Sequence, residues 1–375
     1  MDKLGIIEKG YIRIKGSILH SIGNMCDLKQ EDDEAIINLE GACCYPGFID
    51  AHTHLGMWED GLGFEGDDGN ESTDPSTPHL RALDAINPLD RCFEEGLKAG
   101  VTSVLTGPGS ANPIGGQITA MKTYGRRIDD MVIKSPAALK FAMGENPKTV
   151  YHERSQMPIT RMATASIIRE QFFKAKKYLK QLQDSERDED LEEPEYDFKC
   201  ESLLPVIKKE IPAHIHAHRA DDIFTAIRVA KEFDINYTII HCTGGYEISD
   251  YLASENITAL CGPILCDRSK PELKNLTPKN PGILSKAGVK VAIVTDHPVV
   301  PIQYLPLCAG ICVREGMDYM QALAAITINP AAICGISNRV GSLAPGKDAD
   351  IVVFDTDPFS VYAKPQMVIC NGIIV

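Results

Sequence analysis

Residues 46–54 read Pro-Gly-Phe-Ile-Asp-Ala-His-Thr-His, and this short stretch decides the fold. Its apolar first half predicts a buried β-strand. Residues two apart on a strand point to the same side, so His52 and His54 project into one space at the carboxyl end of that strand. Two imidazoles at this spacing suit Zn, Fe or Mn. A single histidine is more often a satisfied polar residue than a ligand, but a pair ending an apolar strand favours a metal site.

Three later apolar segments also end in histidine or aspartate. Residues 213–218 place His214, His216 and His218 on one face of a predicted strand, residues 237–242 include His241, and residues 289–295 lead into Asp296 and His297. Enzymes with a (β/α)₈ barrel hold their catalytic groups at the carboxyl ends of the strands. Seven of the ten histidines fall in these four places, which is hard to explain by separate buried histidines.

Strands alternate with helices through the middle of the chain, and this alternation predicts parallel βα units. Residues 46–339 are therefore expected to form an α/β fold, a (β/α)₈ TIM-type barrel. The predicted strands are 47–51, 101–106, 131–134, 138–143, 213–218, 237–242, 257–261 and 289–295. The clearest predicted helices are 88–99, 163–183, 221–232 and 317–328.

Both ends of the chain have the pattern of short antiparallel strands. Near the start, the predicted strands are 11–15, 18–22 and 35–39; near the end, they are 351–354, 366–370 and 373–375. Asn371-Gly372 between two apolar runs is a strong hairpin signal. Residues 1–45 and 340–375 are therefore expected to form one small β-sandwich domain.

Composition excludes several other classes of protein. The net charge of −14 argues against a nucleic-acid-binding surface. The sequence shows no apolar leader and no run of 18 apolar residues, so we expect a protein away from membranes. Its 12 cysteines are scattered without a Cys-x-x-Cys pair, so we expect a cytoplasmic protein. The acidic segment 183–196 is expected to be a solvated insertion, with a lid over the site as the alternative.

The sequence resembles the amidohydrolase superfamily, nearest to imidazolonepropionase-like metal-dependent hydrolases. The resemblance covers nearly the whole chain and rests on motifs in the family's order: PGFIDAHTH, HIHAHRADDI, IIHCTGG, VTDHP and VGSLAPGKDADIVVFD. It implies one or two divalent metals per chain, with Zn favoured and Fe or Mn as alternatives. The ligands implied are His52, His54, His216, His241 and Asp296.

Two ligand assignments have alternatives. Among the histidines of residues 213–218, the family pattern favours His216, with His218 as the second choice. Lys140, inside a predicted strand, is expected to be carboxylated and to bridge two metals, because a buried lysine with a depressed pKa can react with CO₂ as the neutral amine. The alternatives are that Glu145 is the ligand, or that Lys140 pairs with an acid.

The ligand set predicts hydrolysis of a C–N bond in a small, cyclic or peptide-like amide. Metal-activated water would attack, with Asp296 as the general acid and base and with His241 or His297 stabilising the oxyanion. An amidine-ring deaminase and a non-catalytic binding protein are the alternatives. The expected partner is a small-molecule substrate, and the resemblance is compatible with a homo-oligomer. Predicted substrate contacts are His79, Arg81, Tyr151, His218, Arg219 and His297.

Overall fold

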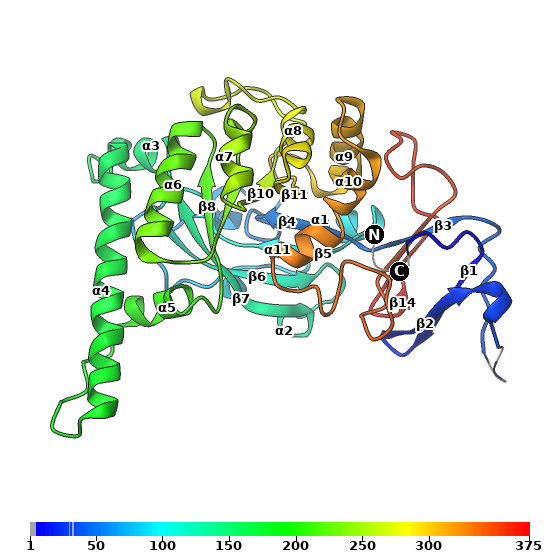
Figure 1. Cartoon of the computed structure of the whole chain (residues 1–375), viewed down its shortest axis with the longest axis horizontal. Helices are drawn as coiled ribbons and strands as arrows, with labels where there is room; N and C mark the ends of the chain where they lie inside the picture. The colour runs from blue at the N-terminus through cyan, green and yellow to red at the C-terminus, as the bar shows by residue number, and fades with distance from the viewer. Residues whose placement is uncertain (1–4, 30, 32–33) are drawn as a thin grey trace.

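One eight-stranded sheet, curved into a nearly closed barrel, forms the centre of the molecule (Figure 1). This computed structural model describes residues 5–29, 31 and 34–375. The strands are neighbours in chain order: β4 (Phe48–Thr53), β5 (Val101–Thr106), β6 (Ile114–Lys122), β7 (Val132–Ala142), β8 (Ala213–Ala217), β9 (Tyr237–His241), β10 (Thr258–Cys261) and β11 (Lys290–Ile293). Residues that follow β11 bond back to β4, from Asp296 N to His52 O at 3.2 Å and from His54 N to His297 O at 2.9 Å. The seam between the two ends of the sheet therefore brings Asp296 beside the His-x-His pair.

The prediction of eight parallel strands is wrong at one place. β6 runs antiparallel to both β5 and β7, and the two strands predicted at 131–134 and 138–143 are one strand, β7. No strand is predicted at residues 114–122, because Gly115 and Gly116 weaken the strand pattern there. Gly116 also has no room for a side chain, because a Cβ there would lie 2.6 Å from Leu80 O. Pro136 interrupts the pattern of β7 and lies where the β6–β7 register shifts, as expected for proline in a strand.

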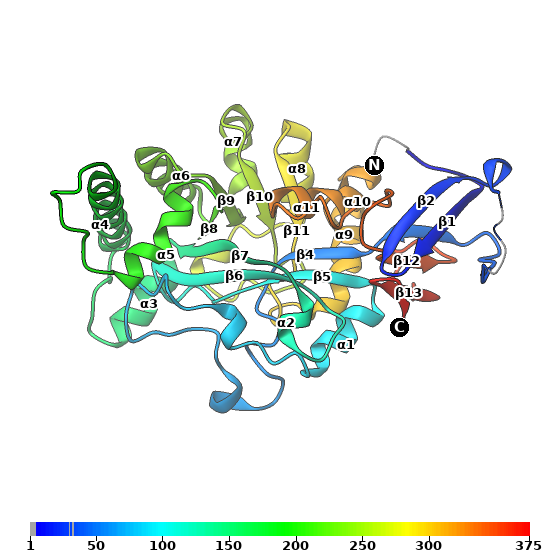
Figure 2. The ribbon, with the colours of Figure 1, turned by 90° about the horizontal axis from the view of Figure 1, so that it is seen from below.

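Helices cover the outside of the sheet, mostly between successive strands (Figures 1 and 2). They are α1 (Arg91–Lys98), α2 (Ile128–Met131), α3 (Glu145–Glu153), α4 (Arg161–Arg187), α5 (Phe198–Ile207), α6 (Ala220–Phe233), α7 (Ser249–Ser254), α8 (Asn280–Ala287), α9 (Leu305–Arg314), α10 (Tyr319–Ala324) and α11 (Ile328–Ile333). The Thr160 side chain caps α4 by accepting a hydrogen bond from Ala163 N. The largest apolar cluster joins β7–β11 to α4, α5 and α6, and includes Phe141, Phe172 and Phe233.

The chain ends meet beside the barrel, where Figure 2 places β1, β2, β12 and β13 together. β1 (Gly10–Lys15) pairs with β2 (Ile18–Asn24), and β3 (Cys43–Pro46), β12 (Ile351–Phe354), β13 (Met367–Cys370) and β14 (Ile373–Ile374) form a four-stranded sheet. Leu19 of β2 packs with Ile351, Val353 and Ile369 in one apolar cluster. The β-sandwich itself is not confirmed, and the division into two domains stays a prediction.

Two details of the chain ends test the predicted turns and strands. Asn371 and Gly372 both have positive φ, 50° and 77°, as the two-residue hairpin predicted here requires. The strand predicted at 35–39 is wrong, because residues 34–39 pair with no other strand. These residues are mostly exposed, so their apolar members add little burial to hold a strand in place.

A buried ion cluster joins the barrel to the C-terminal strands. Lys122, at the end of β6, is 1% exposed, and its Nζ lies 2.9 Å from a carboxylate oxygen of Asp348 and in close contact with Asp350. Asp348 is also paired with Arg339 at 2.8 Å. Residues more than 200 positions apart are thereby tied together at the junction.

The acidic segment lies away from the strand ends that carry the histidines. Residues 188–197 are largely exposed and follow α4, whose C-terminal part projects beyond the rest of the molecule in Figure 1. They lead through α5 into the amino end of β8, whereas a lid would have to follow the carboxyl end of a strand. The solvated insertion therefore describes this segment better than the lid. Among the described residues, no helix is long and apolar enough to cross a membrane.

Candidate metal centre

β4 presents His52 and His54 with their Nε2 atoms facing the barrel seam. The His54 Nδ1 donates to Gly107 O at 2.6 Å, and because a carbonyl only accepts, the neutral ring must carry its proton on Nδ1. The lone pair of His54 is therefore on Nε2, 3.4 Å from Asp296 Oδ1. His52 Nε2 lies 3.2 Å from the same oxygen. These three side chains form the first ligand group.

Asp296 and His241 share an unusual backbone. Both have positive φ, 57° and 68°, a region that residues other than glycine rarely adopt. Such strain collects at functional sites, where surrounding structure holds it in place. His241 Nδ1 donates to Gly262 O at 2.7 Å, which leaves its Nε2 lone pair for a metal.

β8 contributes two histidines to a second ligand group. Atoms of His216, His218 and His241 all lie within 4.8 Å of one another, and the rings of His218 and His241 stack with centroids 4.3 Å apart. Both His216 and His218 therefore lie at the centre. The Nδ1 of His218 is 2.7 Å from Thr243 Oγ1. His214 lies deeper, opposite Lys140 in the β7–β8 ladder, and is in neither ligand group.

The donors fit a divalent metal. With metal–nitrogen distances near 2.0–2.1 Å, two ligands on one tetrahedral ion lie about 3.4 Å apart. The contacts of Asp296 with His52 and His54, at 3.2 and 3.4 Å, have this spacing. Both ring nitrogens of buried His216 have no hydrogen-bond partner among the described residues. A buried polar group without a partner is costly, and a bound ion would remove that cost.

Burial sets the charge of the site. It lowers the pKa of His52 to about 3 and holds the pKa values of His216, His218 and His241 well below the ordinary range. These imidazoles are therefore neutral, which is the form that binds metal.

Lys140 on β7 is 1% exposed and faces the first ligand group. Its Nζ lies 3.3 Å from His52 Nε2, and no described carboxylate lies within salt-bridge distance of it. Burial lowers its pKa to about 7. Glu145, the alternative ligand at this place, instead accepts a hydrogen bond from Glu272 N at 2.9 Å.

The predicted substrate contacts are spread more widely. Exposed Arg81 and Arg219 each bind a neighbouring aspartate, Asp84 and Asp221. Buried Tyr151 donates to Asn112 Oδ1 at 2.8 Å. Two predicted histidines are also engaged: His79 packs against the Phe198 ring, and His297 Nδ1 accepts from Ile302 N.

Sequence reasoning missed two residues beside the centre. Glu272 Oε1 lies 3.4 Å from His216 Nε2 and 3.5 Å from His218 Nε2. It sits on an irregular loop after β10, where no periodic pattern could have singled it out. Trp58 packs edge-on against His54, with ring centroids 4.5 Å apart. Trp58 is the only tryptophan in the sequence and lies four positions after a predicted ligand. The sequence therefore offered a clearer reason to single out Trp58 than Glu272.

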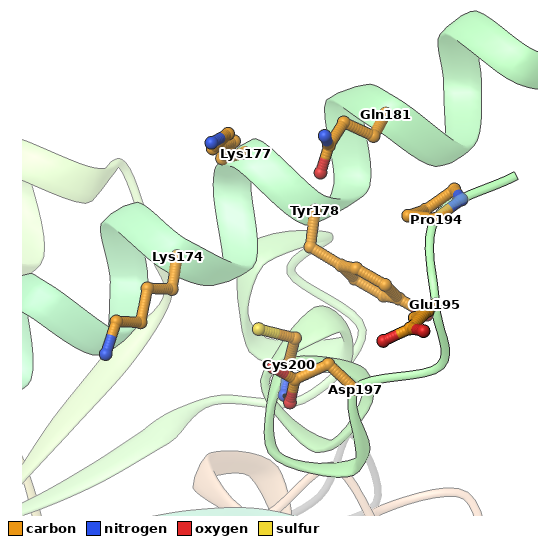
Figure 3. A pocket seen from close by; sticks show the side chains of 8 residues that line it. All are labelled: Lys174, Lys177, Tyr178, Gln181, Pro194, Glu195, Asp197 and Cys200. Carbon is orange, nitrogen blue, oxygen red and sulfur yellow. Dashed lines mark hydrogen bonds between the residues drawn. The ribbon is translucent and has the colours of Figure 1, made fainter. Parts of the chain in front are cut away.

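Two cavities differ in their relation to the centre. A cavity of about 270 Å³ is lined by Glu145, Arg161, Arg219 and Glu272, and so reaches a residue that touches the ligand histidines. The other, about 370 Å³, lies between α4 and residues 194–200 (Figure 3). Its wall includes Tyr178 and Cys200 but none of the predicted site residues, so the larger cavity is not where the chemistry is expected.

Comparisons with known proteins identify the family of this chain. The model of the amidohydrolase family matches residues 44–375. A crystal structure of an amidohydrolase from Thermotoga maritima is 44% identical, with a TM-score of 0.93 over 97% of this chain and 94% of that one. Amidohydrolase tasK of Hapsidospora irregularis is 29% identical over 97% of this chain, which spans only 39% of that relative. An imidazolonepropionase of Alkaliphilus oremlandii is 23% identical over 95% of this chain and 86% of its own length.

More distant structures share the fold alone. One is a Xaa-Pro dipeptidase with 18% identity and a TM-score of 0.56. The matched family and the two histidine and aspartate groups support a hydrolase that depends on a divalent metal. The chain therefore belongs to the amidohydrolase family.

Proposed function

We propose that this protein hydrolyses a C–N bond in a small amide, and that a cyclic amide suits it best. The observation that carries the proposal is the position of Asp296, whose Oδ1 lies 3.2 and 3.4 Å from the Nε2 atoms of His52 and His54. An ionised carboxylate at this place can serve both as a ligand and as a base for the attacking water. The similarity to an imidazolonepropionase supports the cyclic substrate.

In this proposal the ligands are His52, His54, His216, His241 and Asp296, with carboxylated Lys140 as a bridge. Zn is the favoured ion, and Fe or Mn are the alternatives. When bound, a divalent metal would lower the pKa of water toward neutrality and polarise the carbonyl group. The position of Lys140 Nζ, buried and 3.3 Å from His52 Nε2, supports the bridging role.

The residues of the chain move the proton and position the substrate. A carboxylate oxygen of Asp296 accepts the proton of the attacking water and returns it to the leaving nitrogen. His297 Nδ1 accepts a hydrogen bond from Ile302 N, so its neutral ring carries the proton on Nε2. That N–H is available to stabilise the oxyanion, the role expected of His297 or His241.

An amidine-ring deaminase is the second candidate, and two contacts weigh against it. Deaminases that this chain resembles usually have a glutamate soon after the histidine of the fifth strand, where this chain has Asp221 and Asp222. Asp221 is bound by Arg219, and Asp222 is held by Arg161 through two hydrogen bonds of 2.7 and 3.1 Å. Neither carboxylate is therefore free to transfer protons at the centre.

The test is a substrate panel with metal-loaded protein. Five- and six-membered cyclic amides, linear N-acyl compounds and amidine rings are compared by substrate absorbance and by ammonia release. We expect ring opening of a cyclic amide, lowered about 10²- to 10⁴-fold in Asp296→Asn. Asp267→Asn, the same change on an exposed loop, should keep the wild-type rate. Ammonia release from amidines alone would establish the deaminase instead, and an unchanged rate in Asp296→Asn would remove the assigned base.

A further inference from the structure

We infer that Glu272 is a metal ligand, paired with His216 and His218 on a second ion. The inference rests on the proposed metal-dependent function, but it adds a carboxylate from the loop after β10. Glu272 lies on a short 3₁₀ turn, residues 271–273, and its side chain is 1% exposed. A glutamate this deeply buried needs partners that offset the loss of water, and Lys270 Nζ, 2.7 Å from Oε1, is one of them.

The geometry of Glu272 repeats that of the first ligand group. Glu272 Oε1 lies 3.4 Å from His216 Nε2 and 3.5 Å from His218 Nε2. Asp296 Oδ1 has nearly the same distances to its own two imidazoles, 3.2 and 3.4 Å. Each carboxylate oxygen therefore lies from its two imidazoles at the spacing of two ligands on one tetrahedral ion.

The backbone holds the Glu272 carboxylate in this position. Glu272 Oε2 accepts from Glu145 N at 3.2 Å, and Glu272 N donates to Glu145 Oε2 at 2.9 Å. Oε1 is thereby turned toward the histidines, and Lys270 Nζ approaches it at 2.7 Å. Ligand carboxylates are commonly oriented by such outer contacts.

The charge of the ligand set and the missing hydrogen bonds of His216 also support a ligand role for Glu272. An imidazole ligand brings no negative charge, so His216, His218 and His241 alone would offer an ion none. Glu272 supplies that charge and completes a His₂Glu set, one of the known ligand sets for zinc. Neither ring nitrogen of His216 has a hydrogen-bond partner within the described part of the chain, and its Nε2 lies 3.4 Å from Glu272 Oε1.

The test compares metal binding by the wild type, Glu272→Gln and Glu247→Gln. Glu247 is the control because it also lies on a short turn after a strand, and its exposed side chain accepts a hydrogen bond from Asn275 Nδ2. Metal per chain is measured by elemental analysis, and Zn²⁺ affinity by competition with a chelator. We expect Glu272→Gln to lose one ion per chain or to bind it at least about 10-fold more weakly. The control should match the wild type.

A further variant separates a ligand from a charge partner of Lys270. Glu272→Asp keeps the negative charge but withdraws the oxygen by one methylene, so a ligand role predicts weaker binding and a charge-balancing role predicts no change. Equal metal content and affinity in Glu272→Gln or in Glu272→Asp would overturn the inference while leaving the proposed function intact. A wild type that binds no metal would instead refute the proposed function itself.

Discussion

Replacing Lys122 by methionine should destabilise the protein severely although Lys122 is not a ligand of the metal centre. Methionine has a similar length, so the packing of β6 changes little, but the charge is removed. The Lys122 and Asp350 side chains are only 2% and 3% exposed, and Asp348 is 7% exposed. The substitution therefore leaves two carboxylates in the interior without their shared cation.

The expected loss of unfolding free energy can be divided between the two carboxylates, Asp348 and Asp350. Breaking a buried pair by removing one partner costs about 3–5 kcal/mol of unfolding free energy, because the remaining charge stays buried. Asp348 keeps Arg339 at 2.8 Å, whereas Asp350 keeps only neutral donors, Thr102 Oγ1 at 3.3 Å and Asn371 N at 2.9 Å. Most of the loss should therefore come from Asp350. The double variant Lys122→Met/Asp350→Asn should recover part of it.

Urea unfolding followed by far-UV circular dichroism measures the change, at fixed metal concentration. Lys98→Met is the matched control, since Lys98 pairs with Glu94 on the exposed face of α1, where both side chains are about 70% exposed. An exposed pair of this kind contributes about 0–1 kcal/mol. If Lys122→Met lost no more stability than Lys98→Met, or if the double variant were less stable than Lys122→Met, the assigned role of the buried cluster would be refuted.

Three further predictions concern the metal centre. Lys140→Ala should lower the metal content from about two ions per chain to one or none by elemental analysis; an unchanged content would exclude the bridge. Removing metal with a chelator should change the emission of Trp58, whose ring packs 4.5 Å from that of His54, and Trp58→Phe should abolish the signal; constant emission during metal loss would contradict this contact. His216→Asn should lose bound metal while His214→Asn, a change at a buried histidine outside both groups, keeps it; equal losses would remove the distinction between them.

Local patterns were sufficient for much of the centre. The period of a strand is two residues, so His52 and His54 had to share a face, and apolar runs that end in histidine or aspartate had to end at the same edge of parallel strands. The order of motifs then indicated the amidohydrolase family, which the comparisons confirm. The same reasoning failed at β6, where Gly116 weakens the strand pattern but permits a close approach to Leu80 that only the tertiary structure shows.

What the sequence by itself determined is which segments carry donors and toward which end of the barrel they point, since strand periodicity and chain direction are local properties. Only the tertiary structure decided which donors meet. The seam between β4 and the residues after β11 brings Asp296 to His52, and an irregular loop places Glu272 at His216 and His218. The physical reason is that contact between residues more than fifty positions apart depends on register, barrel closure and loop path. None of these leaves a periodic trace in the chain.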